Sequence, residues 1–217
     1  MEPTLVYLGA GAFASASALI ARLYALRGDV PPERWRSYKR IDIADAVAHR
    51  VQRICGTLEY IDSAPLVAPL SGRQCAYYEV TVEEFGPPDG VGWVTRHVGR
   101  EMKDFFVRDS TARARVCPSS PTVMLDIDEK VVPQFFKKRP PSVQRLLDQL
   151  PDVTIDDPEC VCIREGVLEA GETITVMGGC YWEADEAQHM YRDMGRRLVI
   201  GATDEGDMFL SDRKIKR

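Results

Sequence analysis

Apolar and polar side chains alternate through much of the chain after about residue 50, and this two-residue period is typical of strands with one buried face. The clearest case is Tyr77–Glu84, where apolar side chains alternate with polar ones such as Glu79 and Glu83. The glycines and prolines of Gly86–Gly90 interrupt this strand, and Val91–His97 is predicted to return as its hairpin partner.

The same period, or a short apolar run between turn residues, predicts more strands. They are Gln52–Tyr60, two strands around an Asp-Ser turn within Phe105–Val116, Cys160–Ile163 with Glu165–Leu168, Glu172–Trp182, Arg197–Ile200 and Asp207–Leu210. Between residues 41 and 61 the spacing also fits a helical stripe, and the second half is predicted as the strand. Only Pro141–Leu150 has clear helical spacing among the later segments. The pattern predicts an α+β, β-rich fold, a barrel- or sandwich-like antiparallel sheet domain with one or two helices.

Thr4–Ala21 differs from the rest because it is an 18-residue stretch without a charge. That length is close to what a helix needs to span a bilayer, although its many alanines make it weakly apolar. A cleaved signal peptide fits less well, because Met1-Glu2-Pro3 lacks positive charge. Basic residues follow the stretch, and by the positive-inside rule they place the body of the protein on the cytosolic side. We therefore expect a single-pass membrane protein with an N-terminal transmembrane helix.

Residues 28–48 are basic and interrupted by prolines, and we expect a juxtamembrane linker there. Trp35 and Tyr38 lie among its arginines, a combination typical of the headgroup region of a membrane. The alternative is a solvated linker without lipid contact.

The N-terminal stretch has a second interpretation, because Gly9-Ala10-Gly11 belongs to a G-x-G-x-x-A pattern after a short apolar run. Such a turn brings the backbone close to the pyrophosphate of NAD or FAD. A second strand ending in an acidic residue should follow about 20 residues later. The chain has Pro31-Pro32 there, which suits a central strand poorly. A Rossmann-type oxidoreductase therefore stays an alternative.

The 217-residue chain has a net charge of −5 and 45% hydrophobic residues, so it can form a core and has no basic excess that would favour nucleic acid. We expect no nucleic-acid partner. The cysteines form no C-x-x-C pair, so buried, reduced thiols are expected. They are Cys55, Cys75, Cys117, Cys160, Cys162 and Cys180.

Three blocks of sequence, in order along the chain, resemble the GIDE domain, also called the BAM (beside-a-membrane) domain. The first is Val67–Glu84, which contains Pro69-Leu70-Ser71-Gly72-Arg73 before the alternating strand. The second is Asp104–Val116, with Asp109-Ser110-Thr111 at its centre, and the third is Gly166–Gly179. The resemblance implies a β-rich domain beside a transmembrane helix.

In the mitochondrial and plastid ubiquitin ligases of that family, a second helix and a C-terminal RING follow the domain. This chain departs from that plan, because it stops at Arg217 and has no paired-cysteine and histidine spacing for zinc. Ligase activity depends on the RING in the family and does not carry over. A protein related to E3 ubiquitin transferases, with its RING absent or supplied by another chain, is the alternative from the enzyme class.

Candidate catalytic and metal-binding residues are few, and each histidine lies apart from any local nucleophile or ligand motif. The histidines are His49, His97 and His189. Cys160 and Cys162 would share one face of a strand, and with Cys180 they are the best candidates for a soft metal. Core cysteines are the alternative reading.

Two acidic segments, Asp156–Glu159 and Asp204–Asp207, lack the full pattern of a calcium loop. The basic run Lys137-Lys138-Arg139 fits a surface loop or a contact with an anionic partner. We therefore assign no catalytic, cofactor-binding or metal-binding residue.

These patterns divide the chain into an anchor helix at 1–27, a linker at 28–48, a GIDE-like β-rich domain at 49–213 and a tail at 214–217. We expect a membrane-anchored binding or scaffolding module without catalysis of its own. Its expected partners are membrane lipid, through the N-terminal helix, and an unidentified protein or peptide.

Overall fold

The computed structural model describes Trp35 and residues 37–62, 64–86, 92–133, 140–150, 153–190, 193–203 and 208–213. Several predictions lie outside these residues: the anchor with Gly9–Gly11, the basic run at 137–139, the acidic segment at 204–207 and the tail. No helix in the described part of the chain is long and apolar enough to cross a membrane.

The described residues are rich in strands. These are β1 (Arg40–Ile41), β2 (Arg50–Tyr60), β3 (Leu66–Val67), β4 (Gln74–Cys75), β5 (Tyr77–Phe85), β6 (Trp93–Met102), β7 (Phe105–Arg108), β8 (Arg113–Cys117), β9 (Thr122–Met124), β10 (Glu129–Val131), β11 (Val161–Leu168), β12 (Thr173–Met190), β13 (Asp193–Gly201) and β14 (Phe209–Ser211). The helical elements are the 3-10 turns η1 (Ile43–Asp45) and η2 (Pro158–Cys160) and the helix α3 (Pro141–Asp148).

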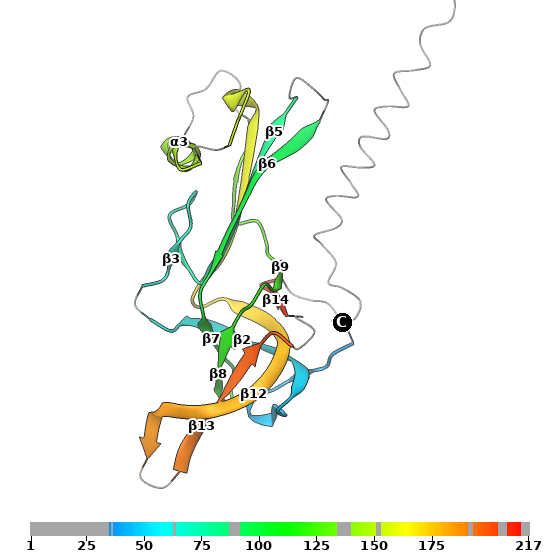
Figure 1. The fold of residues 1–217 in the computed structure, drawn as a ribbon, viewed down its shortest axis with the longest axis vertical. Coiled ribbons are helices and arrows are strands. Elements are labelled where there is room, and N and C mark those ends of the chain that lie inside the picture. The colour runs from blue at the N-terminus through cyan, green and yellow to red at the C-terminus, as the bar shows by residue number, and fades with distance from the viewer. Residues whose placement is uncertain are drawn as a thin grey trace, which may run out of the picture.

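Five strands close into a barrel in the order β2-β7-β8-β13-β12 and back to β2 (Figure 1). Every neighbouring pair in this ring is antiparallel except β8 and β13, which are parallel. A five-stranded Greek-key barrel of this connectivity is the architecture of the OB fold. The predicted barrel-like, β-rich domain is therefore confirmed at the level of architecture.

Alternation of small apolar and charged residues places β8 in the barrel wall. Ala114 and Val116 are fully buried in the core, whereas Arg113 and Arg115 lie on the outer surface. Phe105 and Val107 on β7 fill the same core. The two-residue period of the sequence thus reports correctly which side chains fill the barrel.

A second sheet, in the order β10-β11-β5-β6, extends away from the barrel, with α3 beside it (Figure 1). Val143 and Leu146 of α3 pack against Val80, Val82 and Ile163 of this sheet. The helix predicted at Pro141–Leu150 is therefore present, and its apolar stripe covers one face of the extension. We call this unit the projecting sheet.

The prediction of an antiparallel sheet was wrong for three strand pairs. β1 and β2, β8 and β13, and β14 and β9 run parallel. Alternation reports which face a side chain occupies, and it is the same whether the neighbouring strand runs parallel or antiparallel. The direction depends on long connections that leave no local pattern.

The second half of the predicted linker belongs to the fold. Trp35 is 2% exposed, and its ring lies 5.8 Å from that of Phe209, in a cluster with Met124 and Met177. β1 pairs with β2, and the ambiguous helical stripe is reduced to the short turn η1. Trp35 is therefore a core residue rather than one in contact with lipid headgroups.

Candidate interaction surfaces

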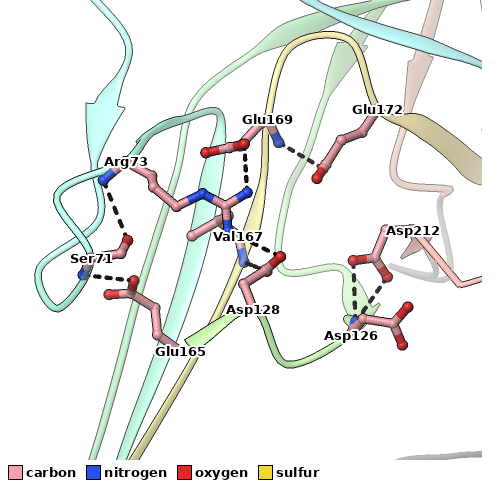
Figure 2. A network of polar contacts seen from close by, with 9 residues as sticks. All are labelled: Ser71, Arg73, Asp126, Asp128, Glu165, Val167, Glu169, Glu172 and Asp212. Carbon is pink, nitrogen blue, oxygen red and sulfur yellow. Dashed lines mark hydrogen bonds and ion pairs between the residues drawn. The ribbon is translucent and has the colours of Figure 1, made fainter. Parts of the chain in front are cut away.

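The loop that carries the first block of the family resemblance is held by one buried carboxylate (Figure 2). Glu165 on β11 is 1% exposed and accepts hydrogen bonds from the backbone N–H groups of Leu70 at 2.7 Å and Ser71 at 3.0 Å. The Leu70 side chain is buried in the cluster beneath α3. The conspicuous turn chemistry of this motif therefore fixes a loop against the projecting sheet.

Arg73 completes this attachment by bridging two carboxylates (Figure 2). Its guanidinium lies 3.1 Å from Asp128 and 2.6 Å from Glu169. The hydrogen bond to Glu169 is the main reason that the pKa of Arg73 rises above its ordinary value. Asp128 also accepts a hydrogen bond from the N–H of Val167 at 2.8 Å, so the bridge reaches the backbone of β11.

Other carboxylates around this bridge bond to backbone. Asp212 accepts hydrogen bonds from the N–H of Asp126, and burial raises the pKa of Asp212 to about 6. Glu172 accepts one from the N–H of Glu169 at 2.8 Å, and burial raises its pKa as well. In the part of the chain that the structure describes, no group of three or more His, Cys, Asp or Glu residues is arranged to hold a metal ion.

The second block of the resemblance also forms hydrogen bonds that hold distant segments together. Asp109, in the turn between β7 and β8, accepts hydrogen bonds from the N–H groups of Ile43 at 2.7 Å, Thr111 at 2.8 Å and Ala112 at 3.0 Å. Burial alone would raise the pKa of Asp109, but these hydrogen bonds and the one from the Thr111 hydroxyl lower it. The turn is thereby joined to η1, which lies 66 positions earlier in the sequence.

The structure does not bring the candidate cysteines together. Cys162 lies on β11 in the projecting sheet, whereas Cys180 lies on β12 in the barrel core. Cys160 instead donates to Asp157 at 3.2 Å, and all six thiols are free. Burial raises the pKa of Cys180 to about 12, which keeps this thiol protonated and a poor metal ligand at neutral pH.

The three histidines and the first acidic segment also lie apart. His97 is on β6 and His189 on β12, whereas His49 lines a cavity of about 230 Å³ at the start of β2. Asp157 caps η2 by accepting from the N–H of Glu159, and Asp156 pairs with an arginine of β6. These acids have structural partners.

The outer face of β7 and β8, next to β13, corresponds to the second and third strands of OB barrels, whose face binds oligonucleotides in that fold. Four arginines stand on it, but three have strong carboxylate partners. These pairs are Arg108 with Glu59, Arg115 with Asp104 and Arg197 with Glu183. Arg113 lies 4.1 Å from the centre of the Phe106 ring and 3.9 Å from Glu59. Most of the positive charge on this face is therefore neutralised by carboxylates, and the face does not offer a row of free cations to a nucleic-acid backbone.

β6 is different, because it forms a free edge of the projecting sheet. Among the described strands it pairs only with β5. Trp93, Val94 and Val98 are 45%, 39% and 44% exposed, and Phe85 on β5 is 42% exposed. The Phe85 and Trp93 rings lie 5.2 Å apart near one end of the strand. We call these four side chains, with the outward backbone of β6, the β6 edge surface.

The sequence patterns do not single out the β6 edge surface. The adjacent apolar pair Trp93-Val94, which breaks the alternation of the strand, is the one signal that points to it. Comparisons of the chain with protein-family models, with curated proteins and with solved structures gave no match in any of the three. The resemblance to the GIDE domain stays a prediction.

Proposed function

We propose that this chain is a binding module that takes up an extended polypeptide segment along the β6 edge surface and is held at a membrane by Thr4–Ala21. The observation that carries this proposal is a ten-residue edge strand whose apolar side chains are exposed. An unpaired strand edge presents N–H and C=O groups in a row, and a partner strand can bond to them.

The dimensions of β6 suit a strand-like partner. Ten residues of antiparallel strand are at most about 34 Å long, and a register shift at Arg96 divides β6 into two regular parts. Backbone hydrogen bonds would supply affinity there, and the exposed apolar side chains would select the partner's side chains. The Phe85–Trp93 pair offers a large anchoring surface at one end.

Natural edge strands are commonly protected by charged side chains. The two arginines of β6 are a weak barrier of this kind because they pair with carboxylates of β5. Arg96 pairs with Glu84 at 2.8 Å, and Arg100 pairs with Glu79 at 2.7 Å. Val98 lies between these two pairs and Trp93 and Val94 precede Arg96, so exposed apolar side chains are the dominant feature of the edge.

The membrane part of the proposal rests on the sequence, namely the uncharged stretch Thr4–Ala21 and the basic residues after it. Trp35 is docked in the fold, so only residues 22–34 would connect the anchor to the domain. Such a tether reaches at most about 45 Å when fully extended. It would concentrate the binding surface close to one membrane and to partners on that membrane. We do not propose either enzyme alternative, because no observation on the described residues favours one.

The test is a selection of random displayed peptides against the full chain in lipid nanodiscs. Enriched peptides are then measured against two variants, Val98→Lys on β6 and Val67→Lys on β3. Both valines are exposed, so neither change should disturb the core. We expect Val98→Lys to weaken binding at least about tenfold, as a buried charge at an interface would, and Val67→Lys to leave it unchanged. Equal binding by both variants, or no enriched peptide, would contradict the proposal.

A further inference from the structure

Most arginines of the described chain have a carboxylate partner. They are Arg73, Arg96, Arg100, Arg108, Arg113, Arg115, Arg164, Arg197 and Arg213. Arg40, Arg50, Arg53, Arg145 and Arg196 differ, since within the described residues none of them has a carboxylate oxygen within the 4.0 Å of an ion pair. The buried Nε of Arg53 also has no hydrogen-bond partner there.

Two of these unpaired arginines stand side by side. Arg40 on β1 is the register partner of Arg53 on β2. The following pair, Ile41 and Ile54, packs into the barrel core, so Arg40 and Arg53 both lie on the outer side. Like charges on neighbouring strands repel each other. An anion close to both guanidiniums would relieve that repulsion.

An apolar cluster flanks this pair. Lys39 and Arg50 are exposed and close in sequence, but Arg50 is three positions from Arg53 on β2 and so faces the other side of the strand. On the other side of Arg53, its partner on β12 is Met177, which packs with Trp35. Asp42 is the nearest acidic residue in the sequence of β1 and is half-buried, but it forms no ion pair with these cations among the described residues. We call Arg40 and Arg53 the β1–β2 cationic surface.

We propose that the β1–β2 cationic surface binds the anionic phospholipid headgroups of a membrane. The chain enters the fold at this surface through Trp35, directly after the basic segment that follows Thr4–Ala21. The acidic headgroups of a bilayer reached by that segment would therefore lie close to this surface. Each unpaired cation near a membrane surface adds to the attraction for acidic lipid. The inference rests on the proposed membrane attachment and adds an orientation to it, with the β1–β2 side of the barrel against the lipid.

The experiment measures partition of the full chain into phosphatidylcholine vesicles with and without phosphatidylglycerol. Binding to the neutral vesicles measures attachment by the anchor, and the increase caused by the acidic lipid measures binding by the cationic surface. The proposed membrane attachment and the proposed lipid contact can therefore be refuted independently. We expect phosphatidylglycerol to increase partition by about tenfold or more, and high salt to remove that increase.

Two double variants with the same change in net charge locate the effect. Arg40→Gln with Arg53→Gln should abolish the increase, because neither side chain has a carboxylate partner among the described residues. Arg108→Gln with Arg113→Gln should retain it, because Glu59 already engages both of those arginines. Equal loss in the two double variants, or full retention in the first, would overturn the proposal.

A second readout covers the case in which the anchor alone saturates binding. Hydrogen exchange at Arg40 and Ile41 should slow in acidic relative to neutral vesicles for the unaltered chain, and not for the Arg40→Gln, Arg53→Gln variant. Urea unfolding of both double variants shows whether they fold. No difference in exchange between the two lipids would also overturn the proposal.

Discussion

The carboxylate of Glu165 accepts a hydrogen bond from the backbone N–H of Leu70 at 2.7 Å, across 95 positions of the sequence. A second oxygen of the same carboxylate accepts from Ser71. One buried side chain thus satisfies two backbone donors of a loop that has no ladder partner of its own. The most distinctive motif of the chain is in this way explained as part of the scaffold.

Glu165→Ala should therefore destabilise the protein by about 2–5 kcal/mol, because two backbone N–H groups in a buried or half-buried setting lose their acceptor. Glu129→Ala is the control, since Glu129 is exposed on β10 of the same sheet. Its effect should stay within about 0.5 kcal/mol. Urea unfolding measures both changes, and a similar midpoint for the two variants would refute the role given to Glu165.

Adjacent glycines on β12 should respond differently to alanine. A Cβ on Gly178 would lie 2.5 Å from the carbonyl oxygen of Gly201, whereas one on Gly179 would lie 3.5 Å from that of Ala202. Gly178→Ala should therefore cost about 1–3 kcal/mol through strain in the barrel wall. Gly179→Ala should cost less than about 1 kcal/mol or stabilise the fold. Thermal unfolding of the two variants measures this difference, and an equal loss of stability in both would contradict it.

Asp212 should make the fold less stable as the pH rises. Burial raises its pKa from an ordinary 3.8 to about 6, so the folded state holds this proton more tightly than the unfolded state. Stability attributable to the protonated carboxyl is then complete below about pH 4 and is lost as the pH rises through about 6. Asp212→Asn should remove this fall, seen as a stability difference between variant and parent that grows over that window. A difference independent of pH would contradict the assignment.

Asp109 should act in the opposite direction. Its pKa is lowered by the hydrogen bonds that it accepts, so its contribution is present above the ordinary pKa of 3.8 and is lost as the pH falls through the folded-state value. Asp109→Ala should cost about 1–3 kcal/mol at neutral pH and progressively less in acid. Guanidinium unfolding of variant and parent from neutral pH downward measures this, and a constant difference throughout would count against it.

Local pattern was enough to predict most strands of the barrel and of the projecting sheet, but not β10 or the division into two sheets. The alternation in β5 and β8 and the helical spacing of α3 each follow from residues close in sequence. The parallel pairing of β8 with β13 joins segments about 84 positions apart, as in Ala114 and Leu198, and no local period encodes it. The two-residue strand β1 is too short to show a period at all.

The candidate surfaces were harder to predict because they also depend on residues far apart in the sequence. Within the described residues, the edge position of β6 depends on the pairing of every other strand. In the same part of the chain, the lack of a carboxylate partner for Arg40 and Arg53 depends on where each carboxylate lies. Trp35 was misassigned because its partners Met124, Met177 and Phe209 come from distant segments. A tryptophan among arginines has the same local pattern in a core as at a membrane.

The central claim is that β6 receives a partner strand, and hydrogen exchange of the full chain in nanodiscs tests it most directly. A peptide selected against the chain should slow exchange within Trp93–Met102, at those amides that do not bond to β5. Exchange on the outer barrel strands β7 and β8 should stay unchanged. Protection on β7 and β8 with none along β6 would contradict the account and move the binding surface to the barrel.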